Sequence, residues 1–129
     1  MITQGVLDEN GEYTYKNVYT TSDPAYYGDT TTQLDNMRIA GRNIYTDGYI
    51  KRFDLGSTAE PIANAVGGSA TTFKCDYNYT GAKDSSLRLF LVGGDAHAGG
   101  SAGLGCFSSY NGVSAAYAHV GFRIVKVLD

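Results

Sequence analysis

Residues 93–123 read GGDAHAGGSAGLGCFSSYNGVSAAYAHVGFR, a stretch dominated by Gly, Ala and Ser with isolated aromatic side chains. Its central part, residues 95–119, contains one acid, Asp95, and no Lys, Arg, Glu, Gln or Met. The segment has neither the 3.6-residue period of a helix nor the alternation of a strand. A long unpatterned segment inside a compact domain is usually a functional loop region, so we expect residues 95–119 to form one.

Strand-like patterns lie on both sides of this segment. The run just before it, LRLFLV, is short and mostly apolar, with Arg88 as its one charged residue. The run just after it alternates between side chains that face opposite ways, as do two runs further upstream. We therefore predict strands at residues 12–20, 73–79, 87–92 and 120–127.

Two short helices are predicted between the first two of these strands. The first covers residues 47–55, because Tyr49, Ile50 and Phe53 fall on one helical face. The second covers residues 58–66 and starts with the spacing of a capping box. Strands in several parts of the chain together with one or two short helices predict an α+β fold class.

The domain organisation is predicted to be simple. Residues 1–11 are polar and contain Gly, which is typical of a leader or linker. Residues 25–45 are compatible with either an irregular loop or a short helix. We therefore expect a leader with the start of the first strand at residues 1–16, and one domain at residues 17–129.

Composition excludes several classes of protein. The chain has 129 residues, 43% of them hydrophobic, and a net charge of -3, so a folded domain with a modest core is expected. No cluster of Lys and Arg provides an electrostatic footprint for nucleic acid. No apolar run approaches the length of a membrane span. We therefore predict neither a nucleic-acid partner nor a membrane partner.

The two cysteines and the acidic residues do not form a recognisable metal site. Cys75 and Cys106 are open to two interpretations, a pair or two thiols in a reducing cytoplasm. Neither a CxxC motif nor a His/Cys cluster at zinc spacing is present, and the acids are scattered without a calcium-loop signature. We predict no metal site and no cofactor.

The chemistry of residues 95–119 suits molecular recognition. A Tyr side chain covers much area and loses only two torsions when it is immobilised, while Ser, Gly and Asn adapt their hydrogen bonds cheaply. Long charged side chains lose more entropy on docking, and this segment lacks them. The same composition also occurs in tightly packed loops, with Tyr in a core and its hydroxyl satisfied. Composition alone leaves both interpretations open.

The order of short motifs along the chain resembles a known family. The motifs are Gly93-Gly94, Gly99, Ala102-Gly103, Ser114 and the closing Val120-Gly121-Phe122-Arg123, with Asp47–Lys51, Val66–Ser69 and Lys74–Tyr77 upstream. They resemble phage and prophage proteins of the C-type-lectin/formylglycine-generating-enzyme fold, many of which are diversified by retroelements. Ala96 stands where that family commonly has Trp. The large side chain that packs beneath the ligand-binding face in that family is therefore absent.

The resemblance implies a fold, a function and a set of contact residues. The fold would be C-type-lectin-like, with small twisted antiparallel sheets, one or two short helices and much irregular loop. The function would be ligand binding on a tail fibre or virion surface, with a host-cell protein or glycan as the partner. Other virion or fibre subunits, and a homo-trimer, are implied as further partners. The ligand-binding residues would be Asp95, His97, Ser101, Ser108, Tyr110, Asn111, Tyr117 and His119.

Two alternatives accompany this interpretation. The first is a structural virion or fibre-assembly domain in which the strand at residues 12–20 makes subunit contacts. The second is an enzyme of the formylglycine-generating type, which would need a reactive Cys pair and copper. Cys75 and Cys106 are far apart in sequence, and Asp95 with His97 alone gives weak evidence for a catalytic site. We therefore predict that the chain is not an enzyme.

Overall fold

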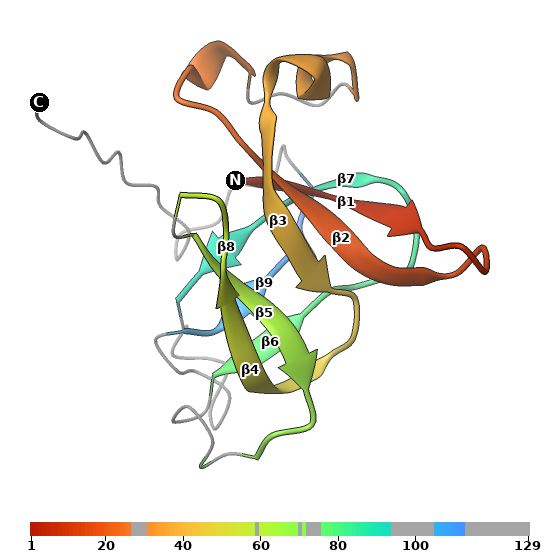
Figure 1. The fold of residues 1–129 in the computed structure, drawn as a ribbon, viewed down its shortest axis with the longest axis vertical. Coiled ribbons are helices and arrows are strands. Elements are labelled where there is room, and N and C mark those ends of the chain that lie inside the picture. The colour runs from red at the N-terminus through yellow and green to blue at the C-terminus, as the bar shows by residue number, and fades with distance from the viewer. Residues whose placement is uncertain (27–30, 59, 70, 72–75, 94–104, 113–129) are drawn as a thin grey trace, which may run out of the picture.

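The computed structural model of this chain describes residues 1–26, 31–58, 60–69, 71, 76–93 and 105–112. Within these residues the chain forms nine strands in two sheets and two short 3-10 helices, Pro24–Tyr26 (η1) and Thr31–Asn36 (η2). In Figure 1 the strands of the first sheet lie in the upper half of the molecule, below the two helices, and those of the second sheet lie in the lower half.

The first sheet has the order β3-β2-β1-β7, and all its neighbouring strands are antiparallel. Its strands are β1 (Ile2–Leu7), β2 (Tyr13–Thr20), β3 (Arg38–Ile44) and β7 (Leu87–Leu89). Strand β2 follows the alternation in its sequence, because Lys16 and Val18 are buried while Tyr15 and Tyr19 are half-buried on the opposite face. The strand predicted at residues 12–20 is confirmed.

The second sheet has the order β5-β4-β6-β9-β8. Its strands are β4 (Gly48–Leu55), β5 (Pro61–Val66), β6 (Tyr77–Tyr79), β8 (Leu91–Val92) and β9 (Phe107–Ser108). Strands β6 and β9 are parallel, and the other neighbours are antiparallel. Strand β9 comes from the segment without a pattern, so part of that segment lies inside the sheet between β6 and β8.

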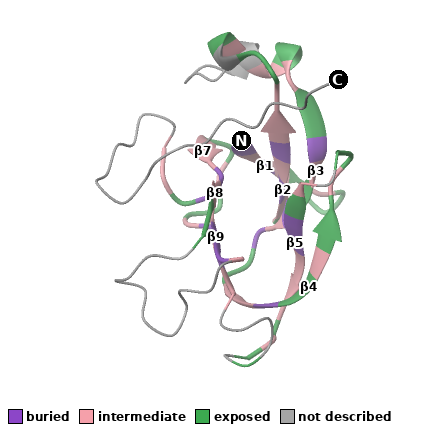
Figure 2. Cartoon of the chain, turned by 90° about the vertical axis from the view of Figure 1, so that its left-hand side faces the viewer, coloured by how far each residue is buried: buried purple, intermediate pink, exposed green. Residues whose placement is uncertain are grey.

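One hydrophobic core lies between the two sheets, and Figure 2 shows buried residues on strands of both. Phe107 of β9 is at its centre: its ring lies 5.1 Å from that of Phe90 and packs edge-on against that of Phe53 at 5.5 Å. Phe90 joins β7 to β8, so one short run of chain passes from the first sheet to the second. The buried core cluster is Val18, Ala40, Ile50, Ala63, Phe90 and Phe107.

The predicted α+β class with a C-type-lectin-like fold is wrong, because the described chain is built from two sheets and has no helix of seven or more residues. Residues 48–55 form β4 and residues 61–66 form β5. Register shifts around Arg52 explain the error. An irregularity of this kind lets Ile50 and Phe53, three residues apart, both contact the core, which imitates helical spacing.

Other elements also differ from their prediction. Residues 1–11, expected as a leader or linker, contain β1, which pairs with both β2 and β7. Residues 25–45 contain β3 as well as the two 3-10 helices. The predicted strand at 87–92 divides into β7 and β8 in different sheets. Within the strand predicted at 73–79, the described residues form β6. The strand predicted at 120–127 lies outside the described residues.

A pair of buried asparagines connects the two sheets. Asn43 of β3 donates from Nδ2 to Oδ1 of Asn78 on β6 at 3.0 Å, and its own Oδ1 accepts from the backbone N–H of Ala63 at 2.8 Å. Asn78 Nδ2 donates in turn to the carbonyls of Ile44 and Thr46, at 3.1 and 2.9 Å. Both side chains are fully buried, so these bonds satisfy groups that would otherwise be costly to bury.

Replacing Asn78 with Ala is expected to lower the free energy of unfolding by about 2 to 4 kcal/mol, because buried carbonyls and the Asn43 amide lose their partner. Chemical denaturation measures the change. Asn10→Ala, at an exposed position, is the matched control and should change stability by about 0.5 kcal/mol or less. Equal stabilities of the two variants would show that the asparagine pair does not hold the sheets together.

Candidate ligand-binding face

The outer side of the second sheet carries a group of tyrosines. Tyr49 of β4 is paired with Tyr77 of β6, and Tyr79 of β6 is paired with Ser108 of β9. Paired residues point to the same side of a sheet, and the alternate residues of these strands, such as Asn78, are buried. These side chains therefore face outward. We call this group, together with Tyr110, the tyrosine face.

The rings of the tyrosine face support one another. Tyr49 packs edge-on against Tyr77, with ring centroids 5.1 Å apart and an interplanar angle of 80°. The rings of Tyr77 and Tyr79 lie 4.4 Å apart at 38°. Burial raises the pKa of Tyr77, and the Asp47 carboxylate and the neighbouring phenols raise it further. Tyr77 is therefore uncharged at neutral pH, and the ring contacts hold Tyr49, Tyr77 and Tyr79 in defined orientations.

Tyr110 is the most exposed member of the face, with 60% of its surface accessible. Its ring lies against the backbone of Gly81, where an added Cβ would come within 2.8 Å of Tyr110 Cδ2 and where φ is +78°. The backbone beside it is fixed: Arg88 Nη1 donates to the Tyr110 carbonyl at 2.8 Å, and Leu89 N–H donates to the Asn111 carbonyl at 2.8 Å. An exposed ring on an ordered backbone loses little freedom when it binds.

A buried lysine lies directly beneath this part of the face. Lys16 of β2 is 1% exposed, and its Nζ donates to the carbonyls of Thr80 at 2.8 Å and Ser109 at 2.7 Å. The Tyr45 ring centroid is 4.4 Å from the same nitrogen. Burial lowers the pKa of Lys16 to about 8, and the charge of Arg88 acts in the same direction. Asp84 and Asp47 act against this shift.

Two carboxylates brace the loops beside the face. Asp47 Oδ1 accepts from the backbone N–H of Thr80 at 2.9 Å and from its hydroxyl at 2.5 Å. Asp76 Oδ1 accepts from the backbone N–H of Gly105 at 2.8 Å. These bonds fix the turn that follows β6 and the entry into β9. Both acids therefore serve the backbone around the face.

The structure brings together part of the predicted site. Ser108 and Tyr110 both belong to the tyrosine face, and Asn111 is half-buried next to Tyr110 with its carbonyl bonded to β7. Cys106, in the same segment, is buried. The remaining predicted contacts lie outside the described residues, as does Cys75: Asp95, His97, Ser101, Tyr117 and His119.

Sequence reasoning did not include three members of the face. Tyr77 and Tyr79 were placed on one side of a predicted strand, which is correct, but nothing in the sequence showed that Ser108 would pair beside them. Tyr49 lies in the helix predicted at residues 47–55. The alternation of Tyr77 and Tyr79 was the available signal, and the parallel pairing of β6 with β9 was the missing information.

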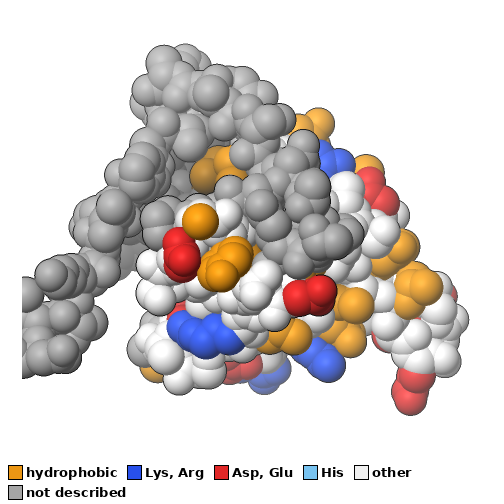
Figure 3. All heavy atoms as spheres, turned by 90° about the horizontal axis from the view of Figure 1, so that it is seen from above, with side chains coloured by type: hydrophobic (Ala, Val, Ile, Leu, Met, Phe, Trp, Pro, Cys, Tyr) orange, Lys and Arg blue, Asp and Glu red, His pale blue; other side chains and the backbone are white. Residues whose placement is uncertain are grey.

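The rest of the described surface gives weaker indications of a binding site. Two open hollows of about 440 Å³ each lie elsewhere, one beside Thr20 and Arg38 and one beside Gln4 and Ser85. In the view of Figure 3, acidic and basic side chains are interspersed on the described part of the surface. Among the described residues, no group of three or more His, Cys, Asp and Glu side chains is placed to hold a metal ion, and no helix is long and apolar enough to cross a membrane.

Comparison of the chain with protein-family models, with curated proteins and with solved structures finds no match.

The lowered pKa of Lys16 predicts that stability rises with pH. Between pH 8 and about pH 10 the unfolded chain binds more protons at this residue than the folded chain does, so the free energy of unfolding should increase by about 2 kcal/mol. Above about pH 10 the increase should reverse, because burial raises the pKa values of Tyr45 and Tyr77 in the fold while tyrosines ionise in the unfolded chain.

Denaturant titrations at several pH values measure this profile. Lys16→Met should lose the rise between pH 8 and about pH 10, whereas Lys51→Met, at an exposed position, should retain it. A rise of the same size in the Lys16→Met variant would mean that another group titrates there.

Proposed function

We propose that this protein is a ligand-binding module that uses the tyrosine face. The observation that carries the proposal is the exposed Tyr110 ring, held on an ordered backbone that continues from β9 of the sheet that carries the outward-facing Tyr49, Tyr77 and Tyr79. Tyrosines of this kind dominate contact surfaces because they bury much area at low entropic cost. Ser108, on the same face, adds a small hydroxyl that can bond in several directions.

The biological setting is proposed from the motif resemblance described above. It favours display on a tail fibre or virion surface of a phage or prophage, with a host-cell protein or glycan as the ligand. Its support is the order of short motifs such as Gly93-Gly94 and Gly121-Phe122-Arg123. The lectin-like fold expected with that setting is not part of the proposal. The face instead belongs to a strand-built scaffold.

The test is a binding screen followed by substitution. Fluorescently labelled protein is incubated with a panel of bacterial cells and with a glycan array, and Tyr110→Ala is then compared on whatever the wild type binds. Loss of a central aromatic anchor is expected to weaken binding by roughly 30-fold or more. The free energy of unfolding should fall by about 1 kcal/mol or less, because the ring is mostly exposed.

Two further variants make the result specific. Tyr110→Phe keeps the ring and should retain most of the binding, while Tyr26→Ala removes a tyrosine from η1 and should leave binding unchanged. Unchanged binding by Tyr110→Ala would show that the tyrosine face is not the contact surface. Loss of folding in that variant would show that Tyr110 is a core residue.

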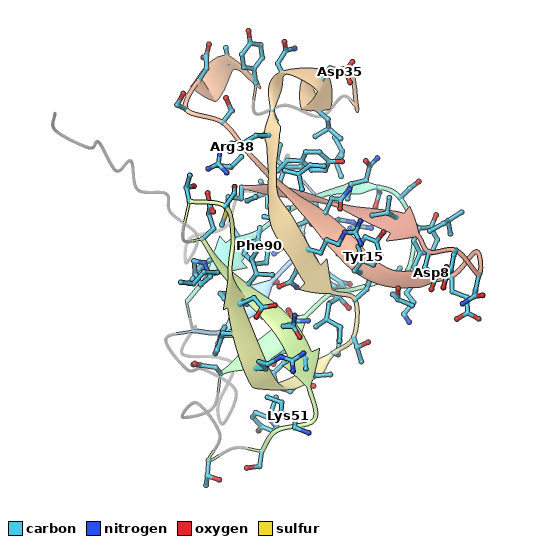
Figure 4. All side chains as sticks on the ribbon, viewed as in Figure 1. Asp8, Tyr15, Asp35, Arg38, Lys51 and Phe90 are labelled. Atoms are coloured by element: carbon cyan, nitrogen blue, oxygen red, sulfur yellow. The ribbon has the colours of Figure 1, made fainter. Side chains whose placement is uncertain are left out.

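A second role, assembly with other copies of the chain, is favoured by the outer side of the first sheet. There the Arg42 guanidinium lies 4.2 Å from the Tyr15 ring centroid, and Asn17 and Tyr19 lie along the same side of β2. Ile39 is 51% exposed on β3, at the end of the strand order. Figure 4 shows Tyr15 on this sheet, well above Lys51. Aromatic and Arg side chains are enriched at protein interfaces.

This second role predicts self-association, with a trimer as the expected state. Sedimentation or light scattering gives the mass of the pure protein. Ile39→Lys should shift the mass to that of a single chain, because a charge would be buried in the contact. A monomeric wild type at high micromolar concentration would rule out this role and leave the ligand-binding role untouched.

A further inference from the structure

The two carbonyls that accept hydrogen bonds from Lys16 belong to the chain segments that carry Tyr110 and Gly81. Thr80 lies between Tyr79 and Gly81, and Gly81 is the residue against which the Tyr110 ring packs. Ser109 lies between Ser108 and Tyr110. The ammonium group therefore ties together, from inside the fold, two backbones whose outer surfaces meet at the Tyr110–Gly81 contact.

The backbones of the two segments are also bonded directly, just past the pairing of β6 with β9. Ser109 donates to the Tyr79 carbonyl from its backbone N–H at 2.8 Å and from its hydroxyl at 3.3 Å. That link ends the ladder between the two strands. Beyond it, near Gly81 and Tyr110, the ammonium beneath donates to one carbonyl of each segment.

We propose that Lys16 is the positioning residue of the tyrosine face: its ammonium group sets the spacing between the segments at Thr80 and Ser109 and thereby the orientation of Tyr110 on Gly81. The inference deepens the proposed function, since it names the internal group on which the binding surface depends. Lys16 itself is buried and does not contact the ligand.

The surroundings of Lys16 explain why the charge matters. The ion pairs of the described residues are Arg38–Glu60 and Arg88–Asp84, so the direct partners of the Lys16 charge there are two carbonyls and the Tyr45 ring. Asp84 and Asp47 also favour the charge. Bonds from a charged donor are about twice as strong as those from a neutral one. The titratable groups around it are Asp84, Asp47, Arg88 and Tyr45.

The packing of Tyr110 on Gly81 has a direct readout. A ring stacked on a glycine shifts the NMR signals of its Hα protons, and the shift depends steeply on ring position. In Lys16→Met, the Gly81 Hα signals should move toward their values in an unstructured peptide. Hydrogen-exchange protection of the Ser109 amide should fall roughly tenfold, because the segment opens locally more often.

Lys51→Met is the matched control. It removes the same charge and the same donors from an exposed position on β4, at the lower end of the molecule in Figure 4. The Gly81 signals and the Ser109 protection should match those of the wild type. If Lys16→Met folds and leaves both readouts unchanged, Lys16 does not position the face.

A titration of the wild type covers the case in which Lys16→Met fails to fold. The Lys16 side-chain signals should titrate near pH 8, and the Gly81 Hα signals should move with the same midpoint as the charge-assisted bonds weaken. A Lys16 midpoint near 10.5, or Gly81 signals that do not follow Lys16, would overturn the proposal.

These measurements use no ligand. If the Gly81 and Ser109 signals respond as expected but the screen finds no ligand, only the proposed function is contradicted. If the protein binds through Tyr110 but these signals do not respond, only this inference is contradicted.

Discussion

A buried ammonium group bonds the first sheet of this protein to the second. Lys16 lies on the inner side of the first sheet, and its bonds end on carbonyls at the ends of β6 and β9 in the second. An unpaired charge in a protein interior is expensive, so its surroundings must be arranged to receive it. The Tyr45 ring contributes to this arrangement, and its hydroxyl is bonded in turn to the carbonyl of Ala82.

The asparagine pair beside this group extends the same constraint. Asn43 and Asn78 hydrogen-bond to each other at the junction of β3, β5 and β6. They also bond to three backbone groups there, one N–H and two carbonyls. Hydrophobic contacts around Phe107 supply area but little direction. Directional polar contacts on one side of the core and non-directional packing on the other together give the two sheets one relative placement.

The sequence allowed the strands with clean alternation to be predicted. Strand β2 was identified because Lys16 and Val18 alternate with tyrosines, and β6 because Tyr77 and Tyr79 do. The spacing of Ile50 and Phe53 predicts a helix where the structure has β4, because a register irregularity at Arg52 brings both side chains to the same core. Local periodicity assumes regular geometry, and it fails wherever tertiary pairing selects an irregular strand.

The candidate site was predicted in part for a similar reason. The composition around Tyr110 indicated a recognition surface, and the structure shows that ring exposed. Tyr49, Tyr77 and Tyr79 come from other strands, and only the non-local pairing of β6 with β4 and with β9 puts them in the same sheet as the segment before Tyr110. A positively charged residue in β2 gave no sign that it would lie beneath the same surface, because that contact spans more than ninety residues of chain.

The position of β1 within the first sheet has a consequence for how the molecule acquires its structure. Ile2 pairs with Leu89, and the Met1 carbonyl accepts from Phe90, so the opening residues of the chain meet partners made much later. Such a topology closes large loops before most contacts form, which favours slow folding. During synthesis on the ribosome, the hydrogen-bonding edge of the early strands would stay unpaired until the second half of the chain emerges. Chaperones would be expected to occupy nascent chains longest in that interval.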